Sequence, residues 1–245
     1  MNRYSKVLSL GLVGAVGLAG CASGQEAEPD APVEVTSTNQ LTADERAEGW
    51  ELLFDGASMD GWRAYSGGDP VGWAVTDGML TRTGPGGDII TDQDFDDFEL
   101  SLEWRVEAAG NSGIFYRAAL GEEWIYHSAP EMQVLDDAEH YDGGDPLTSA
   151  GANYGLHPAP RGVVLPAGAW NEARIVVRGA SVEHWLNGTQ VVAYELWSPE
   201  WEALVQGSKF VEWPAYGRAE RGHIGLQDHG DPVWYRNVKI RELGE

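Results

Sequence analysis

The sequence predicts an all-β protein, a two-sheet antiparallel β-sandwich of the jelly-roll type. Three observations lead to this fold class. Short segments in which apolar and polar residues alternate recur along the chain, clusters of Gly, Pro, Asn and Asp separate them, and no long segment has helical periodicity. About two hundred residues follow the N-terminal region, and a sandwich of that length commonly forms one domain.

Ten segments are expected to form strands, because period-two alternation runs through each of them between turn-forming residues. They are residues 73–75, 79–82, 99–106, 113–118, 131–135, 174–177, 182–186, 190–194, 223–227 and 233–240. The pair Asn187-Gly188 predicts a tight hairpin turn. Two short helices are expected over residues 42–52 and 199–205, with Thr42 and Ser198-Pro199 as their start signals.

Residues 1–20 have the features of a bacterial lipoprotein signal peptide. A basic start precedes an apolar run over residues 7–19, which is too short to span a bilayer comfortably and is followed by Gly20-Cys21. We expect Cys21, the only cysteine, to become the lipidated N-terminus; the alternative is an ordinary cleaved signal with an incidental cysteine. The expected location is extracytoplasmic, lipid-anchored to the cell envelope, at the outer membrane or periplasm in a diderm host.

Residues 21–40 differ in composition from the rest of the chain. They consist mostly of Glu, Pro, Ala, Ser and Thr, with almost no large apolar side chain. Such a segment cannot bury enough apolar surface to offset the entropy of ordering. We therefore expect a disordered tether over residues 21–40 and the folded domain over residues 41–245.

The formal net charge of −23 limits the class of partner. It disfavours nucleic acid and anionic lipid, so we expect no nucleic-acid partner and membrane contact only through the lipid anchor. The same charge also keeps an exported protein soluble. The net charge neither attracts nor repels a neutral carbohydrate. Some of the eleven tryptophans are expected to stack their ring faces on sugar rings.

Residues 131–135 carry the most informative functional pattern. Alternation places Glu131 and Gln133 on one face of a strand, while Met132 and Val134 point into a core. A carboxylate beside an amide suits a sugar, but Gln133 cannot be a nucleophile. Ordinary two-carboxylate glycoside hydrolysis is therefore in doubt, and something in the substrate must make cleavage easier.

Neighbouring strands are expected to bring further polar side chains to the face of Glu131. The expected set is Glu103, Arg117, Glu131, Gln133 and Gln227. Glu131 is the candidate general base, with an ion pair to Arg117 as its structural alternative. Gln133 is expected either to bind sugar hydroxyls or to hydrogen-bond across the sheet. An exposed polar face with scattered ion pairs is the alternative for the whole set.

Motifs over about residues 47–243 resemble, in order, those of the 3-keto-disaccharide hydrolase domain family. They are GWELLFDG from Gly49 with Gly61-Trp62, NSGIFYR from Asn111, EMQVLDD from Glu131, Gly151 with Tyr154, Trp170-Asn171, HWLNG from His184, Lys209-Phe210, GHIGLQDHG from Gly222 and Arg236-Asn237. The resemblance implies a concanavalin A-like jelly roll of the lectin/glucanase type and action on 3-keto glycosides.

A ketone at sugar C3 explains how cleavage can proceed without a nucleophilic carboxylate. The ketone acidifies the C2 proton, so a base can remove it, and the enolate can expel the C1 substituent before water adds. Direct hydrolysis at C1 is the other route, and the sequence leaves both open. Such a site needs a base, a group that holds the enolate oxygen, and an acid near the leaving oxygen.

Three further residues are candidates for these tasks. His229 follows a strand and precedes a Gly-Asp-Pro turn, where it can act as acid or base or stabilise the turn. Lys209, among apolar neighbours, can polarise the ketone or hold the enolate, or lie in solvent. Tyr154, in a Gly-rich segment, is expected to bind sugar or only to pack. Glu103, Arg117, Gln133 and Gln227 complete the expected substrate-binding set.

An acidic loop follows the Glu131 strand. Asp136, Asp137 and His140 are its candidate ligands for a divalent metal ion, the one cofactor considered. The spacing matches no known metal-binding loop, and a solvated acidic loop is the alternative.

Three functions compete at this point. The first is an enzyme that cleaves 3-keto glycosides supplied by a separate dehydrogenase, since the chain has no dinucleotide fingerprint. The second is a carbohydrate-binding module without catalysis. The third is an ordinary glycoside hydrolase, which needs a second carboxylate about 5–9 Å from Glu131, with Glu103 as the first candidate.

Overall fold

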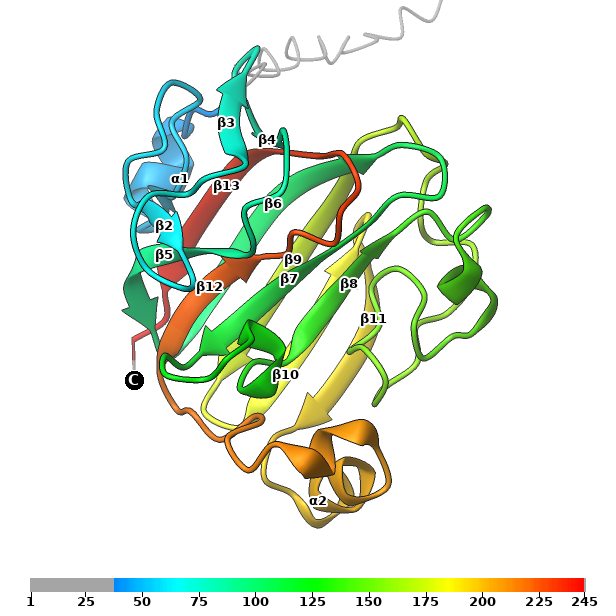
Figure 1. Ribbon diagram of the computed structural model, residues 1–245. Helices are drawn as coiled ribbons and strands as arrows, with labels where there is room; N and C mark the ends of the chain where they lie inside the picture. Colours follow the sequence, from blue (N-terminus) through cyan, green and yellow to red (C-terminus); the bar gives the residue numbers. More distant parts are fainter. Residues whose placement is uncertain (1–37, 245) are drawn as a thin grey trace, which may run out of the picture. The chain divides into compact units, whose positions relative to one another are not determined.

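Two antiparallel sheets form the protein, as the sequence predicted. The computed structural model describes residues 38–244. An eight-stranded and a five-stranded sheet lie one in front of the other (Figure 1), with large apolar side chains between them. The arrangement confirms an all-β, two-sheet sandwich.

The larger sheet has the order β11-β10-β9-β6-β13-β4-β3, and β1 pairs with β13. Its strands are β1 (Glu51–Leu52), β3 (Trp73–Thr76), β4 (Met79–Arg82), β6 (Phe98–Val106), β9 (Asn171–Arg178), β10 (Ser181–Leu186), β11 (Thr189–Glu195) and β13 (Val233–Glu242). The smaller sheet has the order β2-β5-β12-β7-β8. Its strands are β2 (Trp62–Ala64), β5 (Ile89–Phe95), β7 (Asn111–Ala118), β8 (Glu131–Leu135) and β12 (Gly222–Leu226).

The core follows from alternation along each strand. In β6, Leu100, Leu102 and Trp104 point inward, and in β8 Met132 and Val134 do so; all five are at most 1% exposed. Alternate residues of β8 therefore face outward, away from the core between the sheets. This is the face on which Glu131 and Gln133 lie.

The two expected helices are present, one of them shorter than predicted. Helix α2 (Pro199–Gln206) begins after Ser198, whose side chain accepts the N–H of Trp201. Helix α1 (Ala43–Ala47) has the capping box of Thr42 and Glu45 but does not reach residue 52. Gly49, at a φ of 85°, ends the segment, because the left-handed backbone conformation that glycine readily adopts is incompatible with a continuing helix.

Short strands and a domain boundary are the parts of the fold that the sequence did not reveal. Strands β1 and β2 are too short for alternation to be recognised, and the exposed centre of β5 bulges out of its pairing with β12. Asn39 belongs to the folded domain, so its expected place in the tether is wrong. Its side chain donates to Gly78 O and accepts from Asn237 N at 2.7 and 2.8 Å.

The expected signal peptide, Cys21 and residues 21–37 of the expected tether lie outside the described residues. Over residues 38–244, no helix has the length and apolar character needed to cross a membrane.

Candidate active site

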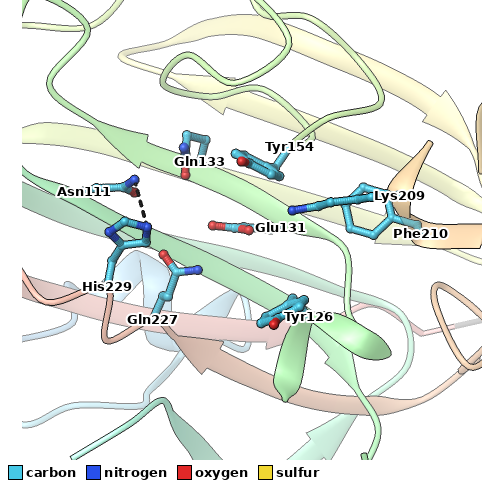
Figure 2. A pocket seen from close by; sticks show the side chains of 9 residues that line it. All are labelled: Asn111, Tyr126, Glu131, Gln133, Tyr154, Lys209, Phe210, Gln227 and His229. Carbon is cyan, nitrogen blue, oxygen red and sulfur yellow. Dashed lines mark hydrogen bonds between the residues drawn. The ribbon is translucent and has the colours of Figure 1, made fainter. Parts of the chain in front are cut away.

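Six of the predicted site residues meet in one pocket on the outer face of the five-stranded sheet (Figure 2). Its volume is about 170 Å³, on the order of ten times what one water molecule requires. That space suits a single sugar ring. The lining residues come from β7, β8, the end of β12 and the loops around them: Asn111, Tyr126, Glu131, Gln133, Tyr154, Lys209, Phe210, Gln227 and His229.

Strand β8 lies at the edge of its sheet, and the segment after residue 150 covers that edge. Gln133 N donates to Ala152 O at 3.0 Å, and Tyr154 N donates to Glu131 O at 3.0 Å. These bonds satisfy backbone groups that an open edge would expose. They also place Tyr154 at the pocket wall and leave Glu131 only 7% exposed and Gln133 1% exposed.

Gly113 makes room for the Glu131 carboxyl group. Gly113 lies on β7 opposite Gln133, and the Glu131 side chain folds back over it. A Cβ at position 113 would lie 2.7 Å from Glu131 Cδ and 2.9 Å from its Cγ, which is closer than such atoms can approach. The glycine of the Asn-Ser-Gly segment is therefore part of what positions the carboxyl group.

The environment of Glu131 favours its neutral form. Burial raises the pKa of the Glu131 carboxyl to about 8, and the positive charge of Lys209 opposes this rise. The pKa of the Tyr154 hydroxyl is raised to about 12, chiefly by burial, so this hydroxyl keeps its proton. The pocket thus has a carboxyl group that titrates close to neutral pH next to a permanent hydrogen-bond donor.

Lys209 is held among aromatic rings at the start of the 3-10 helix η3 (Lys209–Glu212). Its Nζ lies 4.5 Å from the ring centre of Tyr154, 5.3 Å from that of Phe210 and 5.8 Å from that of Tyr126. Figure 2 shows the ammonium group extended toward Glu131. Burial lowers the pKa of Lys209, and the charge of Glu131 opposes this. Cation–π contacts hold the ammonium group while its N–H donors remain available.

Three amide side chains present unsatisfied oxygen atoms at the pocket. Asn111 Oδ1, Gln133 Oε1 and Gln227 Oε1 are buried and have no hydrogen-bond partner within the part of the chain that the structure describes. Buried polar atoms are normally paired, because an unpaired one costs about 1–3 kcal/mol. Three such acceptors around one cavity are the arrangement expected for a ligand that brings hydroxyl groups.

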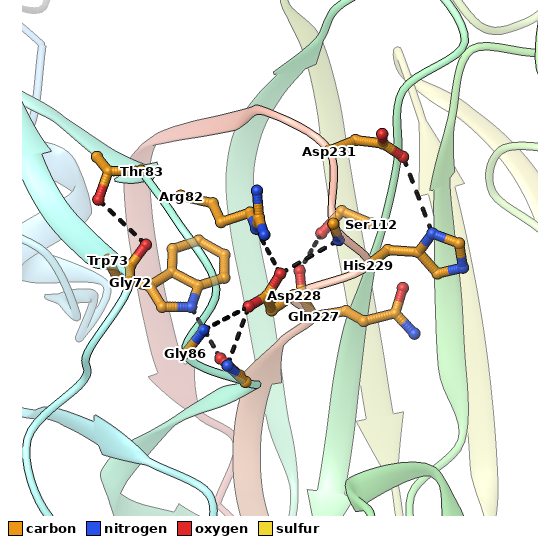
Figure 3. Close-up of polar contacts among 12 residues, drawn as sticks. Gly72, Trp73, Arg82, Thr83, Gly86, Ser112, Gln227, Asp228, His229 and Asp231 are labelled. Carbon is orange, nitrogen blue, oxygen red and sulfur yellow. Dashed lines mark hydrogen bonds and ion pairs between the residues drawn. The ribbon is translucent and has the colours of Figure 1, made fainter.

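His229 lies at the rim of the pocket, with its side chain 39% exposed. Asn111 Nδ2 is 3.4 Å from its Nε2 and 3.3 Å from Nε2 of His140. The neighbouring Asp228 points away from the imidazole (Figure 3). It forms an ion pair with Arg82, whereas Asp231 lies 3.9 Å from His229 Nδ1. The imidazole of His229 thus lies where it is open to solvent and also lines the pocket.

Two of the predicted binding residues lie elsewhere. Glu103 belongs to β6 of the other sheet, where it accepts hydrogen bonds from Arg236 and Asn237 at 2.7 Å. The expectation that it joins Glu131 on one face is wrong, because alternation gives a residue's face but not its sheet.

The second displaced residue is Arg117. Its guanidinium group donates to Gly179 O at 2.8 Å and to Asp96 O at 3.0 Å, and forms an ion pair with Asp97. The backbone at Arg117 has a φ of 51°. Arg117 therefore ties together turns at the edge of the sheets and is absent from the lining of the pocket that Glu131 occupies.

The acidic loop offers no preformed metal site. Asp136 accepts the N–H groups of Ala109 and Ala138, and Asp137 accepts that of Ala150. Across residues 38–244 no group of three or more His, Cys, Asp or Glu side chains is arranged to hold a metal ion. The hydrogen bonds give these carboxylates a structural role in shaping the loop beside β8.

Sequence reasoning missed three residues of the pocket lining. Asn111 lies on the outer face of β7 and was visible as the first residue of the Asn-Ser-Gly segment. Tyr126, in the 3-10 helix η1 (Ile125–His127), and Phe210, beside Lys209, come from irregular segments. No periodicity marks such positions, so only the aromatic content of both segments could have indicated them.

Comparison with known proteins identifies the family. The model of the 3-keto-α-glucoside-1,2-lyase-like domain matches residues 49–241. The chain belongs to this family. The match confirms the resemblance seen in the sequence motifs and makes the chain a glycoside-hydrolase-type enzyme rather than a binding module alone.

Similar proteins support the same fold and the same class of enzyme. A 3-keto-disaccharide hydrolase from Bacteroides thetaiotaomicron is 36% identical over 95% of this chain and 94% of its own length. Among solved structures, a protein from Parabacteroides distasonis described as a glycosyl hydrolase is 32% identical, covers 85% of this chain and 100% of its own, and superimposes with a TM-score of 0.79. A second protein from that organism is 31% identical, covers 79% and 99%, and has a TM-score of 0.63.

Proposed function

We propose that the protein cleaves 3-keto glycosides, including 3-keto-disaccharides, by proton abstraction, elimination and hydration. One observation carries this proposal. Of the side chains in residues 38–244 that line the pocket, Glu131 alone bears a carboxyl group, and it faces a lysine rather than a second carboxylate. Such a site lacks the acid pair of ordinary glycosidases but has a base beside a cation.

The steps follow from the positions of these groups. Ionised Glu131 takes the C2 proton, the C–H electron pair forms an enolate at C2 and C3, and Lys209 stabilises its oxygen. The enolate re-forms the ketone while the C1–O bond breaks, and His229 or Tyr154 protonates the departing oxygen. Water then adds at C1 of the unsaturated ketone and a proton returns to C2, so the net reaction is hydrolysis. The free amide oxygens of Asn111, Gln133 and Gln227 accept sugar hydroxyls.

Parallel assays on 3-keto-trehalose and trehalose test this function. The soluble domain from Thr38 onward is expected to release sugar from the ketone and not from trehalose, because only the ketone acidifies C2. When the reaction is run in D₂O, deuterium is expected at C2 of the 3-keto sugar product. Equal cleavage of both sugars would instead support an ordinary glycosidase, and hydrolysis without deuterium at C2 would support direct attack at C1.

Gly113→Ala is expected to lower kcat at least tenfold, because the new Cβ occupies space that the Glu131 side chain needs. Gly84→Ala is the matched control, since a Cβ there meets no atom within 4 Å and the backbone φ is not positive. Steady-state kinetics measure kcat for both variants, and their melting temperatures show whether a loss of kcat reflects loss of folding. A Gly113→Ala enzyme with normal kcat would show that Glu131 needs no such cradle.

We also propose that the enzyme is exported and anchored to the cell envelope through a lipid on Cys21. The lipoprotein-like signal of residues 1–20 supports this. In cells making the full chain, the wild type is expected in the membrane fraction and to incorporate labelled palmitate, while Cys21→Ser is expected in the soluble fraction. Equal fractionation of the two would mean that Cys21 is incidental.

A further inference from the structure

A second cavity adjoins the active-site pocket. Its volume is about 250 Å³, and it shares the side chains of Tyr126, Gln227 and His229 with the first pocket. Its own wall includes Asp88 and Trp124. Since the same three residues line both spaces, a molecule with two rings can occupy both, with the bond between the rings near the shared wall.

Trp124 offers the second cavity an open aromatic face. Its side chain is among the exposed large hydrophobic residues, at 49%. The indole stacks on Tyr126, with ring centres 6.4 Å apart and planes 13° apart. Tyr126 in turn packs edge-on against Trp213 at 5.3 Å. The stacking fixes the indole without covering it, as a platform for a sugar ring requires.

Asp88 also lines the second cavity and is held in place by a backbone hydrogen bond. Asp88 Oδ1 accepts the N–H of Asp228 at 2.9 Å. The Asp228 carboxylate accepts the N–H groups of Gly86 and Gly87 at 3.0 and 2.9 Å (Figure 3), which holds the loop that carries Asp88. Burial raises the pKa of Asp88 to about 6. At pH 7 this carboxyl group is therefore mostly ionised, and it can accept hydrogen bonds from hydroxyl groups.

The charges around the second cavity restrict its ligand. Asp88 contributes a carboxyl group, the carboxylate of Asp228 is paired with Arg82, and neither Lys nor Arg is among the lining residues that the structure describes. An anionic ring, such as a sugar phosphate or a uronic acid, would be repelled there. A neutral, hydroxyl-bearing ring meets a stacking face and hydrogen-bonding side chains.

We propose that this second cavity is the leaving-group subsite, and that it takes a neutral sugar ring stacked on Trp124. The inference rests on the proposed function, because it treats the adjoining pocket as the place of the 3-keto ring. It adds a substrate preference: the enzyme favours neutral disaccharides over glycosides with small or anionic leaving groups.

Trp124→Ala tests the subsite with two substrates that differ only in the leaving group, 3-keto-trehalose and methyl 3-keto-α-glucoside. The variant is expected to raise KM for 3-keto-trehalose about tenfold and to change kcat/KM for the methyl glycoside less than twofold. Trp185→Ala is the control, since this tryptophan lies on β10 of the other sheet, against Arg174. Equal fold-changes for the two substrates, or none for either, would overturn the proposal.

Binding measurements separate failure of the subsite from failure of the proposed function. If the wild type cleaves neither ketone, the proposed function fails, and the subsite is judged by calorimetry with trehalose and methyl α-glucoside. The wild type is then expected to bind trehalose about ten times more tightly, and Trp124→Ala to remove the difference. Equal affinities in the wild type, or no binding of either sugar, would overturn the subsite.

Discussion

Glu131→Gln is expected to lower kcat on 3-keto-trehalose by about a thousandfold, within the range of about a hundredfold to ten-thousandfold that a general acid or base contributes. Gln has nearly the same shape but cannot accept the C2 proton. KM is expected to change little, because the remaining lining residues still bind the sugar. Glu51→Gln, at an exposed strand residue, is the control and is expected to keep full activity. A Glu131→Gln enzyme within tenfold of the wild type would remove Glu131 from the reaction.

The pH dependence of the wild type follows from the same residue. Since the pKa of Glu131 is raised to about 8, only about a tenth of the molecules carry the ionised base at pH 7. The value of kcat/KM is therefore expected to rise with pH up to about 8 and then to level off. A rate that is constant between pH 6 and 9 would contradict this assignment.

Glu131→Gln is also expected to stabilise the folded protein, but only at higher pH. The carboxyl pKa is about 8 in the folded chain against 4.5 for an ordinary Glu, so the unfolded state loses its proton first as pH rises. The free energy of unfolding contributed by this group falls between pH 4.5 and 8. Gln avoids that loss. We expect a gain in melting temperature on the order of 5 °C at pH 8 and almost none at pH 4.5; equal gains would contradict the raised pKa.

Lys209→Met is expected to lower kcat/KM by roughly a hundredfold to a thousandfold, as loss of one donor to a developing oxyanion does. The rising limb of the pH profile is also expected to move to higher pH, because the ammonium group holds down the pKa of Glu131. Lys209→Arg keeps the positive charge, so it is expected to retain part of the activity and to shift the pH profile less than Lys209→Met does.

The control for Lys209 is Lys239→Met on β13, where the lysine pairs with Glu45 and contacts Trp50. It is expected to leave both the rate and the pH profile unchanged. If Lys209→Met slowed the reaction without moving the pH profile, its charge would act on the substrate alone and not on Glu131.

Much of the fold could be predicted because most strands have one face in the core. Alternation then marks them directly, as in β8, where Met132 and Val134 are buried between the sheets. Strand β5 was not predicted, because its centre, Asp92 to Asp94, is exposed at a bulge and breaks the alternation. The domain boundary near Asn39 was also not predicted. A single buried asparagine leaves no periodic signal in the sequence, although hydrogen bonds to Gly78 and Asn237 hold Asn39 in the folded domain.

The candidate site was predicted where local periodicity was enough. Glu131 and Gln133 share a face of one strand, and their position follows from alternation alone. Glu103 has the same local pattern, but the pairing of strands far apart in sequence put β6 into the other sheet. Tyr126 and the approach of Lys209 to Glu131 depend on loop conformation, for which the sequence has no periodic signal.

The pocket draws on segments that are distant along the chain. Glu131 comes from β8, Lys209 and His229 come near the C-terminal end, and Asp228 holds Arg82 and the loop before β5. During synthesis, a chain that ends before residue 209 therefore contains Glu131 but neither Lys209 nor His229. On the proposed mechanism, activity therefore requires that almost the whole chain has been made, and chains that end earlier are expected to be inactive.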